Sequence, residues 1–507
     1  MLRRIARCAL CLLLLASATA LAAEPIPEPI AIRFDQWTPQ DGLTLSITVP
    51  GDSDGVTSFS NKTCCGIADA RVFVRDVKVR SSGHPLAVAD TGTGWTVHHP
   101  LGATLTVTYR LPPSGPLRID SGTQGQFQPL VDPRTFHLIG TTALVLPTGR
   151  AGSDPVMVEI DATRVASHGR FVSSFGAGNS LHDIRTTRAN VASALYLGGA
   201  LELTTRESDG ETVAVAYTGM QPSPHQAELT GDAFKIIEAE RRFFGDAQPW
   251  YLVSVRGAER NHSNINLGGG MGMTNAFAMF AASDLDASNP EHREQFRWVI
   301  AHEYFHQWNG RQLQVASLPG SEDDDASVYW FSEGVTDFYA TRLLTRAGLL
   351  SPGAALDTLN RKLLRYATNS KRNISARDAG PLFWTDAEAE QIPYLRGYLV
   401  AWYAELAAAR QSGGRRGLDE AMKALVERAK AEPAFRVDNA FLADYLSQGL
   451  AAEEAGVLHR FIIDGGEAPL STDSFRPCLA GAMEKQEAAT PVLQFAFAGP
   501  DTTCFHH

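Results

Sequence analysis

The stretch HEYFHQWN, residues 302–309, places two histidines four positions apart with a glutamate directly after the first. Residues four apart lie one turn above each other on the same face of an α-helix, so His302 and His306 can grip one ion. Glu303 can then angle its carboxylate toward a water in the open coordination position of that ion, which is the location of a general base. The spacing predicts a catalytic zinc site; the alternative is two core histidines that share a helix face.

The residues around this stretch predict the helix that the spacing requires. Asn289 is a good N-cap, Pro290 suits the first helical position, Glu291 favours the positive end, and Gly310 ends the run. The segment is apolar enough to be buried, through Phe296, Val299, Ile300 and Phe305. The zinc motif therefore falls near the C-terminus of a buried helix.

A second helical pattern follows, VYWFSEGVTDFYATRLLTRAG at residues 328–348, closed by Gly348. Glu333 is its natural third metal ligand, since catalytic zinc usually has three protein ligands and a water. Asp337 lies four residues on and can accept the free ring N–H of His302 or His306, which fixes the tautomer of that ligand. The alternative for Glu333 is a solvated carboxylate, but its neighbours are aromatic: Tyr329, Trp330, Phe331, Phe338 and Tyr339.

HEYFHQWN followed by WFSEGVTDFY resembles the glycyl aminopeptidase family of zinc metallopeptidases, relatives of thermolysin and of the larger alanyl-aminopeptidase-type enzymes. The 26 residues between His306 and Glu333 fit this family, as do FKIIEAERRFFGDAQPWYLVSV (234–255), LGGGMGMTNAF (267–277) and PYLRGYLVAWYAELAAARQSGG (393–414). The resemblance covers most of residues 215–465. It implies one Zn²⁺ per chain held by His302, His306 and Glu333, with Glu303 as the base.

The same resemblance implies that Tyr394, in PYLRG, holds the developing oxyanion. A phenol donor opposite the metal is a sensible oxyanion stabiliser, because charge grows on that oxygen in the tetrahedral state. The alternative is that Tyr394 only caps or packs the start of its helix.

One departure from the family concerns the glycine-rich stretch. Related aminopeptidases bind the free amino terminus of the substrate with a glutamate where this chain has Gly272. Residues Gly269, Gly270, Met271 and Gly272 still suit a backbone edge that pairs with an extended peptide, because glycine lets another backbone approach closely. An ordinary glycine turn is an equal alternative. The acidic run from Glu322 to Asp325 is a second candidate for attracting an amine, or a solvated loop.

The pattern along the chain predicts an α+β fold with several parts. Residues 24–215 are rich in short alternating runs such as LTLSITV, RVFVRDVKV, ATLTVTYRL and PVMVEI, which predict an all-β domain. Residues 216–392 form the expected thermolysin-like α+β catalytic domain, with WYLVSV and NAFAMF as strands. Residues 393–465 form a helical bundle that completes the active site, and residues 466–507 a tail closed by a disulfide. The tail is too short for the PDZ domain that family members typically carry.

Composition and the N-terminal segment bear on the compartment. Residues 1–23 hold three arginines, a short apolar run and small residues at Ala20 and Ala22, which predict a secretory signal peptide. The remainder carries 42 Lys and Arg against 56 Asp and Glu, a net charge of −14 that argues against nucleic-acid binding. No later stretch is long and apolar enough to span a bilayer. We expect an exported protein, periplasmic or secreted.

Four cysteines remain after that cleavage. In an oxidising compartment Cys478 with Cys504 is the expected bridge, which leaves Cys64 and Cys65 as a vicinal disulfide or as partners of other groups.

These observations predict an exported zinc-dependent peptidase, in first place an aminopeptidase, acting on peptides. The missing glutamate leaves an endopeptidase or a dipeptide-releasing enzyme as an alternative. A second alternative is a relative that binds peptides without cleaving them. The oligomeric state and the side-chain specificity do not follow from the sequence.

Overall fold

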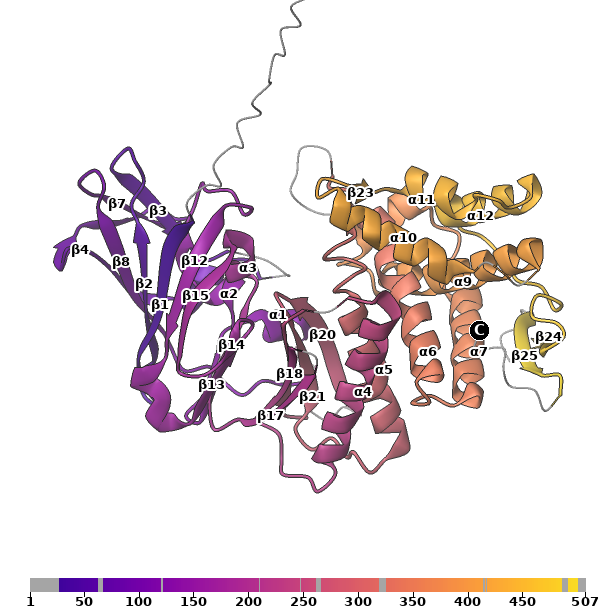
Figure 1. The fold of residues 1–507 in the computed structure, drawn as a ribbon, viewed down its shortest axis with the longest axis horizontal. Helices are drawn as coiled ribbons and strands as arrows, with labels where there is room; N and C mark the ends of the chain where they lie inside the picture. Colours follow the sequence, from indigo (N-terminus) through magenta and orange to yellow (C-terminus); the bar gives the residue numbers. More distant parts are fainter. Residues whose placement is uncertain are drawn as a thin grey trace, which may run out of the picture.

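The computed structural model describes residues 27–62, 67–119, 122–208, 210–246, 248–260, 266–318, 325–413, 415, 417–485 and 491–499. Strands fill the N-terminal half and helices the C-terminal half, with a mixed layer between them (Figure 1). The expected α+β fold is confirmed. The expected signal peptide lies outside the described residues.

The N-terminal half is built on a seven-stranded sheet whose two faces are formed by alternating residues. Its strands are, in spatial order, β15 (Ser180–Thr187), β12 (Pro155–Asp161), β1 (Glu28–Thr38), β2 (Gly42–Pro50), β8 (Thr104–Leu111), β4 (Arg75–Ser81) and β5 (His84–Leu86). LTLSITV, ATLTVTYRL and PVMVEI lie in β2, β8 and β12, as predicted. RVFVRDVKV is a strand only in its second half, because Asp69 caps a 3-10 turn at Ala70–Phe73.

Two smaller sheets complete this half. One orders β14 (Gly176–Ala177), β13 (Arg170–Ser173), β16 (Leu195–Gly199), β10 (Thr135–Ile139) and β9 (Leu130–Val131); the other orders β11 (Leu146–Pro147), β3 (Val56–Ser60), β7 (Trp95–His98) and β6 (Val88–Asp90). They share one core with the large sheet, in which the Phe34 and Phe136 rings stack at 5.4 Å.

The middle layer is a five-stranded sheet whose central strands are buried on both faces. Its order is β17 (Glu202–Ser208), β18 (Glu211–Thr218), β19 (Trp250–Ala258), β21 (Ala276–Ala282) and β20 (Leu267–Met273), with β20 antiparallel at the edge. Val253 and Met279 face the helices, while Leu252 and Ala278 face the N-terminal half. WYLVSV and NAFAMF are therefore the strands β19 and β21, as predicted, and read as continuous apolar runs because neither face meets water. The expected boundary between residues 215 and 216 lies inside β18.

Helices cover the other side of this sheet. α4 (Gln226–Phe244) and α5 (Pro290–Phe305) pack on it, followed outward by α6 (Thr336–Arg346), α7 (Pro352–Thr368) and α9 (Ala387–Ser412), with α10 (Leu418–Ala431), α11 (Asn439–Leu446) and α12 (Ala452–Asp464) around them (Figure 1). The expected boundary between residues 392 and 393 lies inside α9, which runs through Pro393 without interruption.

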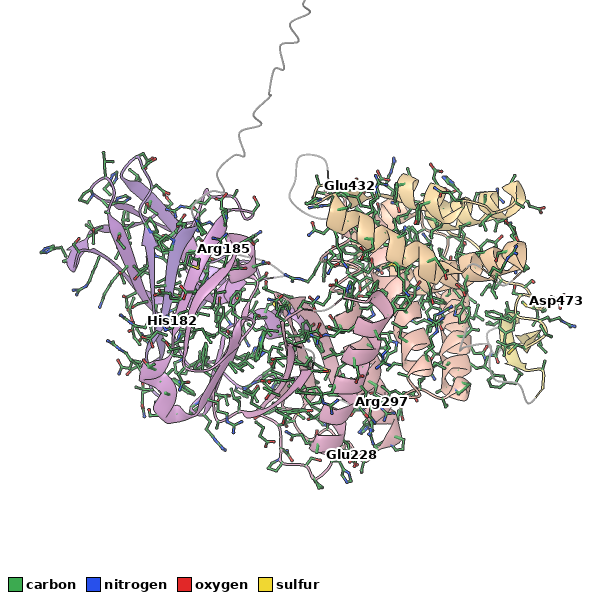
Figure 2. All side chains as sticks on the ribbon, in the orientation of Figure 1. His182, Arg185, Glu228, Arg297, Glu432 and Asp473 are labelled. Carbon is green, nitrogen blue, oxygen red and sulfur yellow. The ribbon has the colours of Figure 1, made fainter. Side chains whose placement is uncertain are left out.

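An ion cluster holds α4 to α5. The buried Asp232 carboxylate accepts from Arg293 Nε at 2.6 Å and from Arg297 Nε at 2.7 Å. Arg297 and Glu228 lie in the lower part of this helix pair in the view of Figure 2. The cluster fixes the helix that carries the two histidines against the sheet-covering helix α4.

The tail folds back as the hairpin of β24 (Leu479–Lys485) and β25 (Pro491–Phe497). It docks on α7 through the Asn360 side-chain amide, which donates to the Phe495 carbonyl oxygen and accepts from the Phe495 N–H. Cys478 is disulfide-bonded. Its expected partner Cys504, and the pair Cys64 and Cys65, lie outside the described residues, so those pairings stay predictions. Among the described helices, none has the length and apolar composition to cross a bilayer.

Candidate metal centre

Helix α5 presents the two histidines at its end. Asn289 caps it by accepting from Glu291 N, with Pro290 in the first turn, as the sequence predicted. The α-helix ends at Phe305 rather than near Gly310, so His306 is its C-cap. Gly310 instead makes the return turn at a φ of +139°, which lets the Arg311 N–H reach the His306 carbonyl.

Glu333 comes from a π-helix rather than from the start of a regular α-helix. The segment expected as one helix is a 3-10 turn at Ala326–Val328, a π-helix at Trp330–Val335 and then α6. Such wide turns occur often at functional sites, because they re-aim side chains within a helix. Glu333 here points across to α5.

Two glycines let this π-helix pack against α9. A Cβ added to Gly397 would lie 1.7 Å from the Trp330 carbonyl oxygen and 2.7 Å from the Gly334 Cα. Added to Gly334 it would lie 2.5 Å from the Gly397 Cα. Glu333 precedes one of these glycines and Tyr394 lies one turn before the other, so this contact sets the distance between the two functional side chains.

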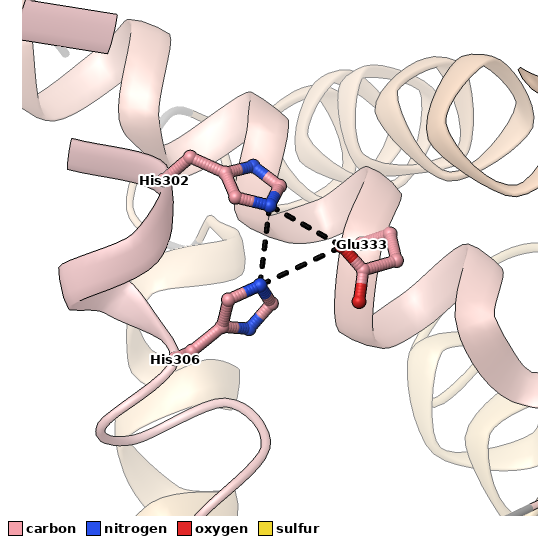
Figure 3. A group of neighbouring side chains, drawn as sticks. All are labelled: His302, His306 and Glu333. Atoms are coloured by element: carbon pink, nitrogen blue, oxygen red, sulfur yellow. Dashed lines mark hydrogen bonds and ion pairs between the residues drawn. The ribbon is translucent and has the colours of Figure 1, made fainter. Parts of the chain in front are cut away.

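The three predicted ligands converge on one point (Figure 3). His302 Nε2 lies 3.1 Å from His306 Nε2 and 3.2 Å from Glu333 Oε2, and His306 Nε2 lies 3.5 Å from the same oxygen. A tetrahedral zinc with bonds of about 2.0–2.1 Å sets its ligand atoms roughly 3.3–3.4 Å apart. The donor set and its spacing therefore fit a zinc ion, and it is the one such group of three among the described residues.

Both imidazoles are fixed through their second nitrogen. His302 Nδ1 lies 2.8 Å from Asp337 Oδ1, and His306 Nδ1 lies 2.9 Å from the Asn309 carbonyl oxygen. Both partners accept, so each ring donates from Nδ1 and turns its Nε2 lone pair to the centre. Asp337 is fully buried and pairs through its other oxygen with Lys362 on α7.

The asparagine of HEYFHQWN ties the two ligand segments together. Its Nδ2 donates to the Phe331 carbonyl oxygen at 3.0 Å and to Thr336 Oγ1 at 3.1 Å, at both ends of the π-helix. Asn309 is 1% exposed, so these bonds are shielded from water. The loop after the histidines thus positions Glu333 directly.

The charges of the group support one another. Burial alone would lower the pKa of His302, but its hydrogen bonds to Asp337 and Glu333 outweigh that effect and raise the pKa to about 10. Burial would raise the pKa of Glu333, yet the His306 charge and the bond to His302 hold that pKa far below its usual range. A carboxylate that stays ionised beside two imidazoles is ready to share a cation with them.

Glu303 faces the same space. Burial raises its pKa, against the lowering effect of His302 and His306. A Cβ added to Gly270 would lie 3.0 Å from both the Cγ and Oε1 of Glu303. The glycine backbone of β20 therefore forms the wall opposite the base.

These groups line one cavity of about 530 Å³ between β20, α5, the π-helix and α9. Residues 268–272 form one side of it, so the glycine-rich stretch is an edge strand and the turn alternative is wrong. Tyr394 lines it, with its ring 6.1 Å from that of His302. Burial first, and then the charges of Glu333 and Asp337, raise the pKa of Tyr394 well above its usual value, so its phenol remains a donor.

Several residues that the sequence did not single out also line the cavity, and four of them have polar or large side chains that matter here. They are Gln126, Arg311, Trp384 and Glu390. Gln126, at the end of α1 (Gly122–Phe127), donates to the Gly268 carbonyl oxygen and so joins the N-terminal half to β20. Trp384 is 66% exposed at the rim. Of the acidic run, Asp325 caps the 3-10 turn, and residues 322–324 lie outside the described residues.

Comparison with known proteins agrees with this geometry. Residues 295–403, which hold His302, Glu303, Glu333 and Tyr394, match the model of the M61 glycyl aminopeptidase family. The resemblance expected from the sequence is confirmed. No curated protein matches the chain.

Two solved structures share its fold. An aminopeptidase N family protein from Idiomarina loihiensis superposes with a TM-score of 0.73 at 18% identity, over 91% of this chain and 81% of that one. A mutant of the M1 zinc metallopeptidase from Deinococcus radiodurans, bound to a Tyr-Ser-Ala substrate, superposes with a TM-score of 0.53 at 16% identity, over 88% of this chain and 95% of that one.

Proposed function

We propose that this chain is an exported peptidase that trims peptides from their amino terminus. The match of residues 295–403 to the M61 glycyl aminopeptidase family supports a zinc metallopeptidase of aminopeptidase-like character. The observation that carries the proposal is the convergence of His302 Nε2, His306 Nε2 and Glu333 Oε2, with Glu303 facing the same cavity. In this proposal these three side chains would hold one zinc ion per chain.

The ion supplies Lewis-acid polarisation of the scissile carbonyl and a lowered pKa of the attacking water. Glu303 accepts the proton of that water and passes it to the leaving amine. Its raised pKa suits both halves of this transfer, because a carboxyl with a pKa nearer neutrality both takes and returns a proton. Asp337 keeps His302 in the tautomer whose Nε2 lone pair faces the metal.

Tyr394 stabilises the oxyanion. Its phenol lies on α9 across the cavity from α5, and its pKa is held high, so the proton stays available for a hydrogen bond as negative charge grows on the carbonyl oxygen. The Gly334–Gly397 contact sets this donor at its working distance from the ligand segment.

Strand β20 positions the peptide. It is the edge of its sheet and lines the cavity with residues 268–272, so an extended substrate can pair with its free backbone groups. Side chains on these glycines would fill the space that the peptide backbone needs; at Gly270 a Cβ would also press on Glu303.

The aminopeptidase mode needs a partner for a free amine, and Gly272 supplies none. Glu390 is the remaining carboxylate of the described lining, one helical turn before Tyr394 on α9, and we assign it that role. An endopeptidase or dipeptide-releasing mode is the second candidate, favoured by Gly272. Comparing a free-amine peptide with its acetylated twin, in wild type and in Glu390→Gln, separates the two modes.

The function is tested on purified protein with a mixed peptide library. We expect about one zinc per chain, cleavage that a chelator abolishes and zinc restores, and a loss of at least 1,000-fold in kcat/KM for Glu303→Gln with zinc content unchanged. Glu238→Gln, an exposed change on α4, is the control and keeps wild-type activity. A metal-free protein, or a Glu303→Gln variant as active as wild type, refutes the proposal.

A further inference from the structure

Arg311 brings a positive charge into the cavity at the end marked by Gly272. It follows the Gly310 turn, its backbone N–H donates to the His306 carbonyl oxygen, and its side chain lines the cavity. The neighbouring lining residues Gly272, Gly310 and Val315 carry no charge. Arg311 is the one arginine or lysine among the described lining residues, and His306 lies beside the two glycines.

The partners of that guanidinium are neutral. Its Nη2 donates to Thr274 Oγ1 at 3.2 Å and, at 3.5 Å, to Asn190 Oδ1. Thr274 is in turn bound to Ser193 Oγ at 2.7 Å. Asn190, in α3 (Arg188–Ala192), and Thr274, in the turn between β20 and β21, thus hold one edge of the guanidinium. No carboxylate of the described residues forms an ion pair with Arg311.

An uncompensated cation in this position needs an explanation. Arg311 is half-buried, and burial lowers its pKa, yet arginine stays charged at neutral pH. Among the buried arginines of the described residues, Arg342 pairs with Glu405 and Arg256 with Asp132, whereas Arg396 donates to the carbonyl oxygens of Arg372 and Ile374. A partly buried guanidinium with neither a carboxylate nor a full set of acceptors gains from a ligand that supplies a carboxylate.

The free edge of the guanidinium fits one kind of ligand. A guanidinium has five N–H donors in a planar fork that matches the two oxygens of a carboxylate. Here Nη2 donates to two neutral oxygens, while Nε and Nη1 have no acceptor among the described residues.

We propose that Arg311 is a specificity-determining residue that binds a carboxylate of the substrate, so that the enzyme prefers acidic peptides. The inference rests on the proposed peptidase function and names its substrate class. The carboxylate can come from an Asp or Glu side chain near the scissile bond or from the end of a short peptide. Glu303 and Glu333 are engaged in the chemistry and Glu390 is exposed at the rim, so none of them neutralises this charge.

The test uses matched peptide pairs that differ only in charge. Asp is exchanged for Asn at each position flanking the scissile bond, and the free C-terminal carboxylate for its amide, which separates the two sources. We expect wild type to favour the carboxylate member of one pair by at least tenfold in kcat/KM, about 1.4 kcal/mol. In Arg311→Gln the two members become equal, while cleavage of the neutral member changes less than threefold.

Two variants control for structure and charge. Arg311→Lys retains the charge without the fork and should keep part of the preference. Arg242→Gln removes an exposed arginine of α4 and should leave it intact. Circular dichroism and thermal unfolding verify that Arg311→Gln folds. If it does not, the carboxylate preference of Arg311→Lys is compared with that of Arg242→Gln instead.

Binding separates failure of the inference from failure of the function. Equilibrium binding of the same pairs to Glu303→Gln reports the carboxylate preference without turnover, and Arg311→Gln in that background should abolish it. Equal affinity for both members of every pair, or a preference that survives loss of the guanidinium, overturns the inference even when peptides are cleaved. If no peptide is cleaved but binding still shows a charge preference that depends on Arg311, the peptidase function is refuted and the carboxylate site is supported.

Discussion

Substituting Gly397 with alanine tests whether the crossing of the π-helix and α9 sets the geometry of the site. The new Cβ would lie 1.7 Å from the Trp330 carbonyl oxygen and 2.7 Å from the Gly334 Cα. Both neighbours are backbone atoms, so no side-chain rotation relieves the contact. The two helices must separate by roughly 1.5 Å to reach ordinary van der Waals distance.

That displacement acts on both sides of the cavity. Glu333 moves with the π-helix and Tyr394 with α9, and ligand atoms now 3.2–3.5 Å apart lose their common centre. A misplacement of about 1 Å can cost 100-fold in rate, so we expect kcat/KM to fall at least 100-fold and zinc to bind more weakly. Overpacking of this kind also lowers the free energy of unfolding by about 2–3 kcal/mol.

The measurements are peptidase kinetics, zinc content after dialysis and urea unfolding. Gly231→Ala is the matched control, because it makes the same change inside helix α4 with no atom within 4 Å of the new Cβ. It should keep full activity and raise the free energy of unfolding by about 0.5–1 kcal/mol. If Gly397→Ala behaves like this control, the close contact does not position the site.

Three further changes have defined outcomes. Asp337→Asn, which weakens the hold on His302 Nδ1, should lower zinc affinity by about 10–100-fold in a competition with a chelator, and unchanged affinity would contradict that role. Gly270→Ala should reduce kcat at least tenfold with zinc content unchanged, because its Cβ would press on Glu303. A normal kcat would show that β20 shifts enough to accept the new Cβ. Asp232→Asn should cost about 1–3 kcal/mol of unfolding free energy at pH 7, since it removes the ion cluster between α4 and α5. Burial would raise the pKa of Asp232, but its arginine bonds hold it below the usual value, so this contribution is present above about pH 4 and is lost as the pH falls further; urea unfolding from pH 3 to 7 should show the gap between wild type and variant close at low pH.

The metal ligands could be predicted because their signal is local. Two histidines four residues apart share one helix face, and a downstream glutamate in an apolar helical pattern is buried near them. This predicts three ligand atoms around one point, whatever the rest of the fold. Strands such as β19 and β21 followed for the same reason, from unbroken apolar runs between turn signals. Arg311, six residues after the last residue of α5, gave no such signal.

Residues brought in from distant segments could not be found this way. Lys362 reaches Asp337 from α7, and Gln126 reaches β20 from the N-terminal half, across 142 positions of the chain. Neither belongs to a spaced motif. The end of α5 was placed too late for a related reason: the apolar pattern continues to Trp308, while the chain already turns back so that Asn309 can bond to the π-helix.

The π-helix at Trp330–Val335 changes the direction of Glu333, and the spacing of apolar residues in the sequence does not predict such a wide turn. Glu333 contacts His302 at Nε2, and Asp337 contacts the same ring at Nδ1, so two carboxylates four residues apart must reach opposite edges of one imidazole. On a regular α-helix, side chains at this spacing lie nearly above each other and point the same way. The wide turn ends at Val335, between the two carboxylates, and changes the direction of Glu333 relative to Asp337. Glu333 thus lies at the Nε2 edge of the ring and Asp337 at its buried Nδ1 edge.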